Sequence, residues 1–557
     1  MNEYLEIDNL TLTTKDGERT LVKNISYRLE KGKTLGIVGE SGSGKTISAM
    51  SVVGLLPPSI TKKEGKIRLH RENQIIEFTE GNSKTLRKAR GKIVSVVFQE
   101  PLSSLNPSMK CGKQLEEIVK QHQKITSAQI KKLILSIMHQ VDLPDPENVY
   151  KSYPYQLSGG QQQRVMIAMA VINNPDYIIA DEPTTALDVL VQKKIIQLLK
   201  NLQEQFGMGI IFISHDIDLV ASISDRIVVM KDGEIMEQGP ALDIMVNPQT
   251  QYTKDLIACK PRPETQKTRL KSIDNKNNSE EKGIIKLPVD CTGDPLLRFK
   301  NVDLKYETGK NFMGTSRKYF HAVKNISFDV YQGETLGIVG GSGSGKSTIG
   351  KAIVRLVEES GGDIWYRGER LSGISSNLHK FRKMIQLVFQ DPYSSLNPKI
   401  RIGEAIFEVL KVHGLCRNRE EGMKKVIDLL TDVKMSSDYL YRYPHELSGG
   451  QRQRIVIARA LAVEPELIIC DESVSALDVS IQAEVLNLLN EIKAKRKLTM
   501  IFISHDLAVV KYMSQRIIVL KDGEIQEIAD SEDLFSKPKS TYSRQLLDAM
   551  VVFQPRD

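Results

Sequence analysis

Residues 37–46 read IVGESGSGKT, and residues 338–347 repeat the pattern as IVGGSGSGKS. In both places a short apolar run ends in a glycine-rich loop with the spacing GxxxxGK[ST], and a segment of helical periodicity follows. The glycines let backbone N–H groups point at phosphate oxygens, and the helix N-terminus adds partial positive charge. The sequence therefore predicts a strand, a phosphate-binding loop and a helix, twice.

The loop residues are the first candidates for nucleotide binding. Lys45 and Lys346 are expected to reach the β- and γ-phosphates, while the hydroxyls of Thr46 and Ser347 are expected to bind Mg²⁺. The complete set is Gly39, Ser41, Gly42, Ser43, Gly44, Lys45 and Thr46 in the first half, and Gly340, Ser342, Gly343, Ser344, Gly345, Lys346 and Ser347 in the second.

The whole chain is a duplication. The blocks VFQEPLSSLNP, LSGGQQQR, DEPTTALDV and IFISHD of the first half return in the same order as VFQDPYSSLNP, LSGGQRQR, DESVSALDV and IFISHD. The offset falls from 301 residues at the loop lysines to 290 at the LSGGQ blocks, so the first half holds about ten extra residues near 60–90. We expect two domains, 1–260 and 296–557, joined by a polar, flexible linker at 261–295.

Composition excludes several classes of protein. A net charge of +8 over 557 residues is too mild to argue for nucleic acid or a membrane surface. The N-terminus has no signal-peptide pattern, and no apolar run approaches the roughly 18 residues that span a bilayer. Five scattered cysteines without CxxC spacing make a disulfide framework, a zinc ribbon or an iron–sulfur cluster unexpected, so we expect buried or incidental thiols.

Chemistry-bearing residues follow the other apolar strands. Continuous apolar strands that alternate with helices predict a mainly parallel sheet, whose ligands bind at the carboxyl strand ends. Asp181 and Asp471 end two such strands, where a carboxylate can hold Mg²⁺. Glu182 and Glu472 follow directly and can act as the general base toward an attacking water.

Glutamine and histidine complete each set. Gln99 and Gln390 follow strands and can touch Mg²⁺ or water without adding charge. His215 and His505 also follow strands, where a neutral imidazole can bond the γ-phosphate and orient the base. Each LSGGQ block starts a helix and predicts a second anion site per half, formed by Ser158, Gly159, Gly160 and Gln161, and by Ser448, Gly449, Gly450 and Gln451.

Together these motifs resemble the ATP-binding cassette (ABC) ATPases over nearly the whole chain. The resemblance implies two P-loop NTPase domains of α/β class, each with a mainly parallel core sheet, an antiparallel β subdomain and a helical signature subdomain. It implies ATP and Mg²⁺, with head-to-tail pairing that joins the loop of one half to the signature of the other, Ser448 and Gly450 or Ser158 and Gly160. Asp188 and Asp478 match the family's D-loop. No catalytic position is lost, so both sites are expected to hydrolyse ATP.

One position breaks the symmetry. The family often places an aromatic under the adenine, and Tyr306 fits this place in the second half. The first half has Thr14 there, so we expect weaker ATP binding at the first site.

The segments PLSSLNP and PYSSLNP, and the tails PQTQYTKDL (248–256) and PKSTYSRQL (538–546), resemble the peptide and nickel importer branch. This implies an ATPase subunit in which two subunits of that branch are fused, peripheral on the cytoplasmic face of the cell membrane. Its partners would be two permease subunits and an extracytoplasmic binding protein. The permease subunits could dock at Leu102, Leu105, Tyr393 and Leu396, for which ordinary loop packing is an equal alternative. The cargo stays open among dipeptides, oligopeptides, glutathione-like peptides and nickel chelates. The alternative is a soluble tandem ABC ATPase that acts on ribosomes or nucleic acid.

Overall fold

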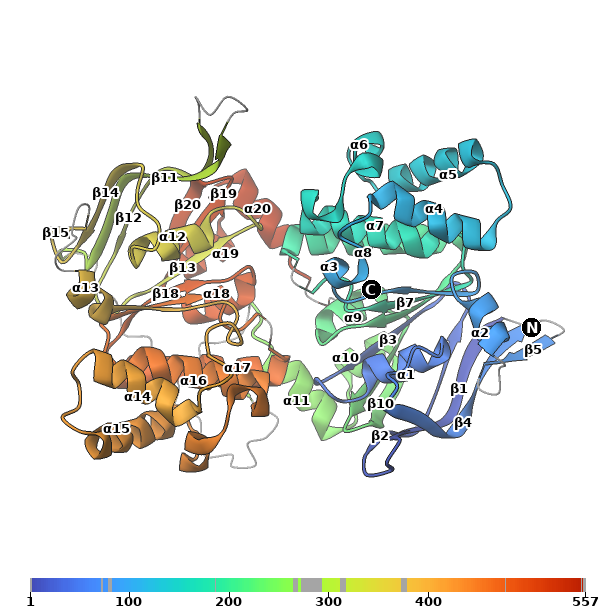
Figure 1. Ribbon diagram of the computed structural model, residues 1–557, viewed down its shortest axis with the longest axis horizontal. Coiled ribbons are helices and arrows are strands. Elements are labelled where there is room, and N and C mark those ends of the chain that lie inside the picture. Colours follow the sequence, from blue (N-terminus) through green and yellow to red (C-terminus); the bar gives the residue numbers. More distant parts are fainter. Residues whose placement is uncertain are drawn as a thin grey trace. The chain divides into compact units, whose positions relative to one another are not determined.

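The computed structural model describes residues 3–71, 74–78, 83–185, 187–263, 269–271, 293–310, 317–371, 378–475, 477–551 and 553. These residues form two compact units (Figure 1). The first unit comprises Met1–Leu187, Val191–Ala258 and Val551–Asp557, and the second comprises Asp188–Leu190 and Cys259–Met550. Most of the predicted linker 261–295 lies outside the described residues.

The core of the first unit is a six-stranded sheet with the order β10-β9-β3-β8-β7-β6. All neighbouring strands are parallel except β9 and β10, which pair antiparallel. Strands β3, β7 and β8 are buried along their whole length, as their continuous apolar sequences predict. The bounds are β3 (Thr34–Gly39), β6 (Val94–Val97), β7 (Tyr177–Asp181), β8 (Gly209–Ile213), β9 (Arg226–Lys231) and β10 (Glu234–Pro240).

A four-stranded antiparallel sheet with the order β2-β1-β4-β5 packs on this core. One hydrophobic cluster joins the two sheets, with Leu5 and Ile67 from the antiparallel sheet and Ile37 and Ile211 from the core sheet. The bounds are β1 (Tyr4–Thr14), β2 (Thr20–Glu30), β4 (Ile60–Arg71) and β5 (Gln74–Glu77).

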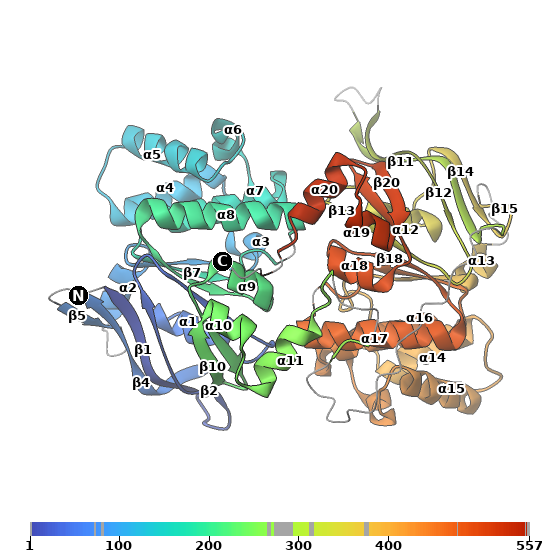
Figure 2. The same cartoon turned by 180° about the vertical axis from the view of Figure 1, so that it is seen from behind.

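Four helices of the first unit, α4 to α7, contact one another. Figures 1 and 2 show α4, α5, α6 and α7 gathered into a helical layer beside the core sheet. The bounds are α1 (Lys45–Val52), α2 (Ser83–Ala89), α3 (Pro101–Ser104), α4 (Cys111–His122), α5 (Ser127–Gln140), α6 (Pro146–Lys151), η1 (Pro154–Gln156), α7 (Gly159–Val171), α8 (Val189–Phe206), α9 (Ile217–Ile223), α10 (Ala241–Val246) and α11 (Gln251–Cys259).

The second unit repeats both sheets, with the orders β16-β17-β18-β13-β19-β20 and β12-β11-β14-β15. The core strands are β13 (Thr335–Gly340), β16 (Ile385–Val388), β17 (Leu467–Asp471), β18 (Thr499–Ile503), β19 (Arg516–Lys521) and β20 (Glu524–Asp530). The antiparallel strands are β11 (Leu297–Lys310), β12 (Arg317–Val330), β14 (Gly361–Tyr366) and β15 (Glu369–Arg370). Strand β4 has 12 residues where β14 has 6, which accounts for part of the extra length of the first half.

The helices of the second unit are α12 (Lys346–Ile353), α13 (Leu378–Met384), α14 (Ile402–Val412), α15 (Arg419–Asp432), η2 (Ser437–Tyr441), η3 (Pro444–Glu446), α16 (Gly449–Leu461), α17 (Val479–Arg496), α18 (Leu507–Met513), α19 (Ser531–Ser536) and α20 (Thr541–Asp548). The predicted fold class is therefore confirmed: two tandem α/β domains, each with a mainly parallel sheet, an antiparallel sheet and a helical layer.

The described part of the predicted linker is packed against the second unit. Asn487 of α17 accepts a hydrogen bond from the backbone N–H of Leu270 (3.0 Å) and donates one to its carbonyl (2.9 Å). Tyr512 of α18 also donates to the Asn487 amide oxygen, at 3.1 Å. Leu270 is buried in the same core cluster as these helices. Residues 269–271 are thus a built-in part of the second unit.

Helix α18 presses closely on β13, the strand that leads to the phosphate loop. A Cβ built on Gly337 of β13 would lie 2.3 Å from Cγ1 of Val510 and 2.7 Å from Oγ of Ser514. Only glycine fits at this contact, and Gly36 meets Val220 and Ser224 in the same way in the first unit.

Replacing Gly337 with alanine tests this packing. The added methyl overlaps side chains in a close-packed core, so Gly337→Ala should destabilise the second unit by about 1–3 kcal/mol. Thermal unfolding should show a transition lowered by several degrees. The matched control is Gly293→Ala, because a Cβ there meets no atom within 4 Å. Equal melting curves for both variants would contradict the close contact.

Candidate ATP sites

Each phosphate loop connects a buried strand to the first helix of its unit. Gly44 and Gly345 precede α1 and α12 with φ of 95° and 100°, a backbone conformation that favours glycine. Lys45 donates to the carbonyls of Gly39 (2.8 Å) and Glu40 (2.7 Å), and Lys346 repeats both contacts at 2.9 Å. Burial lowers the pKa of Lys346 despite the nearby carboxylates.

The loops are chemically suited to phosphate. Ser43 and Ser344 lie inside them with buried hydroxyl oxygens that have no hydrogen-bond partner. A buried hydroxyl without a partner costs free energy, which a phosphate oxygen would recover. The same hydroxyl in both halves therefore supports phosphate binding at both loops.

The predicted Mg²⁺ ligands meet in pairs. Thr46 Oγ1 donates to Asp181 Oδ1 and Ser347 Oγ donates to Asp471 Oδ1, both at 2.9 Å. Burial is the largest influence on both aspartates and raises their pKa values, although the hydroxyl hydrogen bonds lower them. A hydroxyl beside a buried carboxylate is a hard-oxygen donor set, so the residues fit Mg²⁺.

The predicted base is held by three side chains in the first unit. Gln99 Nε2 donates to Glu182 Oε2 at 3.0 Å, Thr185 Oγ1 donates to the same oxygen at 2.9 Å, and His215 Nδ1 lies 3.4 Å from Oε1. Burial, the largest influence, raises the pKa of Glu182, but the hydrogen bonds and the charge of His215 bring it below its ordinary value. The carboxylate is therefore ionised at neutral pH.

The second unit repeats this cluster. Gln390 Nε2 donates to Glu472 Oε2 at 2.8 Å, and His505 Nδ1 lies 3.5 Å from the same oxygen. Burial lowers the pKa of His505, but the adjacent Glu472 carboxylate outweighs it and raises that pKa. Glu182 and Glu472 both have positive φ, 44° and 46°. Such strain in non-glycine residues occurs at functional sites, and it recurs here at equivalent positions.

The signature motifs lie on other helices. Ser158 and Ser448 cap the N-termini of α7 and α16, where each hydroxyl accepts from the backbone N–H of Gln161 or Gln451 and each glutamine side chain accepts from the serine N–H. Gly160 and Gly450 let the following helices approach: a Cβ would meet Val191 at 2.9 Å and Ile481 at 2.2 Å. The structure thus forms the predicted helix N-termini, and their pairing with a phosphate loop stays a prediction.

The residues expected beneath adenine occupy equivalent positions. Leu12 pairs with Val22 and Leu304 with Val323, so Thr14 and Tyr306 stand two residues beyond matching points of β1 and β11. The Tyr306 hydroxyl donates to Thr348 of α12 at 3.4 Å, while Thr14 bonds Asp16 in its own turn. Stacking at the second site alone stays a prediction.

Two tyrosines near the loops were not identified as site residues from the sequence. Tyr252 and Tyr542 belong to the tail motifs, and their hydroxyls reach the phosphate loops of their units. The recurrence of Tyr in both tails was the available signal. Thr185, which bonds Glu182, was also missed, although it lies in the block DEPTTALDV.

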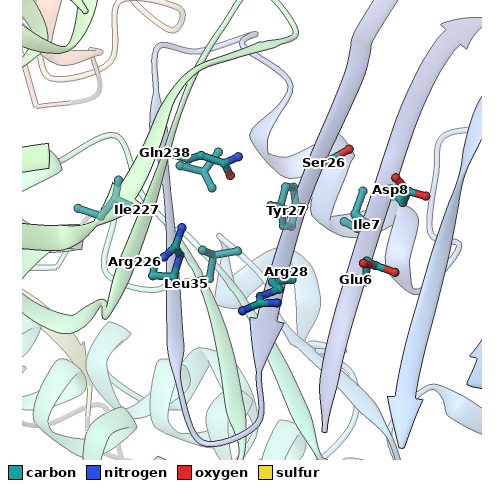
Figure 3. A pocket seen from close by; sticks show the side chains of 11 residues that line it. Glu6, Ile7, Asp8, Ser26, Tyr27, Arg28, Leu35, Arg226, Ile227 and Gln238 are labelled. Atoms are coloured by element: carbon teal, nitrogen blue, oxygen red, sulfur yellow. The ribbon is translucent and has the colours of Figure 1, made fainter. Parts of the chain in front are cut away.

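Other features lie apart from these sites. A pocket of about 320 Å³ lies between β1, β2, β3, β9 and β10. Glu6, Tyr27 and Arg226 are among its lining residues (Figure 3), and no phosphate-loop residue lines it. Cys470 is fully buried and burial raises its pKa to about 12, so it is a core residue. No helix in the described ranges has the length and apolar content to cross a bilayer.

A family model described as ABC transporter matches residues 22–185 and 323–475, and one described as the C-terminal region of oligopeptide/dipeptide transporters matches residues 236–291. The glutathione import ATP-binding protein GsiA of Escherichia coli K12 is 41% identical over 561 residues, covering 99% of this chain and 90% of that protein. The protein of the same name from Shigella flexneri is equally similar.

Two solved cassettes each cover less than half of the chain. A dimeric, ADP- and Pi-bound post-hydrolysis structure of the cassette MJ0796 is 30% identical, with a TM-score of 0.38, and covers 42% of this chain and 98% of its own. CbiO1 from Clostridium perfringens is 26% identical with the same TM-score. The two family matches and the full-length relatives show that this chain, with its two phosphate loops and two strand-end carboxylate clusters, belongs to the ATP-binding, ATP-hydrolysing subunits of ABC transporters.

Proposed function

We propose that the chain is the ATPase subunit of a membrane importer for di- or oligopeptides, bound peripherally to the cytoplasmic face through two permease subunits. One observation carries this: 41% identity over 99% of the chain to a protein named for glutathione import. The match to the C-terminal region of oligopeptide/dipeptide transporters supports the same class of cargo. An extracytoplasmic binding protein would deliver the peptide.

The proposed reaction uses the two clusters described above. Glu182 and Glu472 accept the proton of the attacking water. His215 and His505 orient these glutamates. Gln99 and Gln390 contact the attacking water. Mg²⁺, held by Thr46 with Asp181 and by Ser347 with Asp471, would neutralise phosphate charge. The signature residues Ser158 and Ser448 contribute to ATP binding when the two halves pair head to tail.

A surface of the first unit suits a permease segment. An apolar pocket of about 440 Å³ is lined by residues that include Leu55, Phe98, Leu105 and Met169. Leu55 and Phe98 are each 40% exposed, and the neighbouring Leu102 is 65% exposed. Exposed apolar surface next to Gln99 would place a bound permease segment beside the residue that contacts Glu182.

The equivalent surface of the second unit differs in charge. Arg459 stands where the first unit has Met169, and its guanidinium donates to the carbonyl of Ser395 at 2.6 Å. Tyr393 is 51% exposed, with the Arg452 guanidinium 5.1 Å from its ring centroid.

Two of the four expected docking residues are buried. Leu396 of the second unit lies in the core, and Leu105 of the first unit is only 2% exposed. Leu102 and Tyr393 are thus the exposed candidates.

The double variant Glu182→Gln, Glu472→Gln tests the base assignment. The amide keeps the size of each side chain but cannot accept the proton, so turnover should fall by about 10²–10⁴-fold. ATP should still bind, which filter binding of labelled ATP would show. The control Glu204→Gln changes an exposed residue of α8 and should leave turnover unaltered. Turnover near the native rate in the double variant would contradict the assignment.

Photo-crosslinking tests the importer assignment. A photoreactive phenylalanine analogue at Leu102 or Tyr393, in the tagged full chain in native membranes, should crosslink multi-span membrane proteins. The control places the same phenylalanine analogue at Tyr441 of η2, which is 69% exposed, and this variant should not crosslink to membrane proteins. Mass spectrometry identifies the products. Ribosomal proteins at both positions, with no membrane protein, would support the soluble alternative instead.

A further inference from the structure

The segment that follows each cassette folds back onto the phosphate loop of its own unit. Tyr252 lies in α11, and its hydroxyl oxygen accepts a hydrogen bond from the backbone N–H of Glu40 at 3.4 Å. Tyr542 lies in α20, and its hydroxyl oxygen accepts from the N–H of Gly341 at 3.1 Å. Glu40 and Gly341 are the second residues of the two loops. The contact therefore occurs twice, at equivalent positions.

A carboxylate on the last strand of each core sheet fixes the turn before the tyrosine. Glu237 of β10 accepts from the backbone N–H of Gln249 at 2.8 Å and of Thr250 at 3.1 Å. Glu527 of β20 accepts from the N–H of Lys539 and Ser540, both at 2.9 Å. Burial raises the pKa of both glutamates, but these hydrogen bonds outweigh it and lower the pKa overall. The turn is thus anchored by ionised carboxylates.

The tyrosine rings are fixed as well. Tyr252 and Tyr542 are 6% and 8% exposed. Lys231 Nζ lies 4.9 Å from the ring centroid of Tyr252, and Lys521 Nζ lies 5.0 Å from that of Tyr542. Both lysines end the strands next to β3 and β13. Each ring is therefore held beside its sheet, and its hydroxyl reaches the phosphate loop.

We propose that Tyr252 and Tyr542 are positioning residues of the two ATP sites, which hold the start of each phosphate loop through its second backbone N–H. A glycine-rich loop loses conformational freedom when it closes on phosphate. A loop already fixed at its start loses less, so ATP binds more tightly. The tail thereby becomes part of the nucleotide site. This inference concerns ATP binding and stands apart from the importer assignment.

The two contacts differ in closeness for a local reason. A Cβ built on Gly341 would lie 3.3 Å from the Tyr542 hydroxyl, closer than most real Cβ contacts. Glu40 carries such a Cβ in the first loop, and its N–H is 3.4 Å from the Tyr252 hydroxyl instead of 3.1 Å. Because the shorter hydrogen bond is the stronger one, removal of the Tyr542 hydroxyl should have the larger effect.

The experiment removes one oxygen atom at a time in the full chain. Tyr542→Phe is measured in a Lys45→Ala background, so that the second site dominates, and Tyr252→Phe in a Lys346→Ala background. The control is Tyr441→Phe, which alters a 69% exposed tyrosine. The readouts are the KM for ATP, kcat, the melting temperature, and hydrogen exchange of the Gly341 amide followed by mass spectrometry of peptides that contain it.

Loss of one hydrogen bond predicts a KM raised about three- to tenfold for Tyr542→Phe and less for Tyr252→Phe. The kcat and melting temperature should stay near those of the control, because the Glu472 cluster and the core are untouched, while the Gly341 amide should exchange faster. An unchanged KM would overturn the proposal. A lowered melting temperature with unchanged KM would also overturn it, since the hydroxyl would then serve stability alone.

Discussion

Both ATP sites depend on the junction between a buried strand and the helix that follows it. The loop at this junction has to stay accessible to the nucleotide. The strands β3 and β13 are buried along their whole length, so their final glycines are fixed in position by the sheet. A Cβ on Gly39 would lie 2.1 Å from the carbonyl oxygen of Met230. The loop therefore starts from an immobile point and can present its backbone N–H groups to one place. The carboxylates of β7 and β17 meet that place because parallel strands end on the same side.

The two units are more alike in their candidate ATP sites than in the surfaces beside those sites. The hydroxyl–carboxylate pairs have the same length of 2.9 Å in both units, and both predicted bases keep positive φ. The surfaces beside Gln99 and Gln390 diverged, with Met169 in one and Arg459 in the other. Reaction chemistry tolerates few geometries, whereas a docking surface changes with its partner. The proposed permease subunits would therefore meet different side chains at the two surfaces.

The sequence predicted the fold and the positions of most candidate site residues, because the motifs form through local backbone geometry. GxxxxGK[ST] encodes its own strand–loop–helix, and the apolar runs before Asp181 and Asp471 could only be buried strands. The tail tyrosines were not predicted as site residues, because Tyr252 contacts a residue 212 positions away in the sequence, and no local pattern encodes such a contact. Leu105 and Leu396, which were expected at the docking surface, are each only 2% exposed, because an exposed and a buried leucine look alike in a loop sequence.

The clamp between Asn487 and Leu270 has a consequence for where the second domain begins. Asn487 is 3% exposed, and both its amide oxygen and its amide nitrogen form hydrogen bonds with the backbone of Leu270. A fragment that began at residue 296 would leave this amide without those partners and would uncover the apolar surface that Leu270 now fills. Repeated motifs locate the halves of such a chain, but a fragment that keeps every contact of Asn487 must also include residues 269–271.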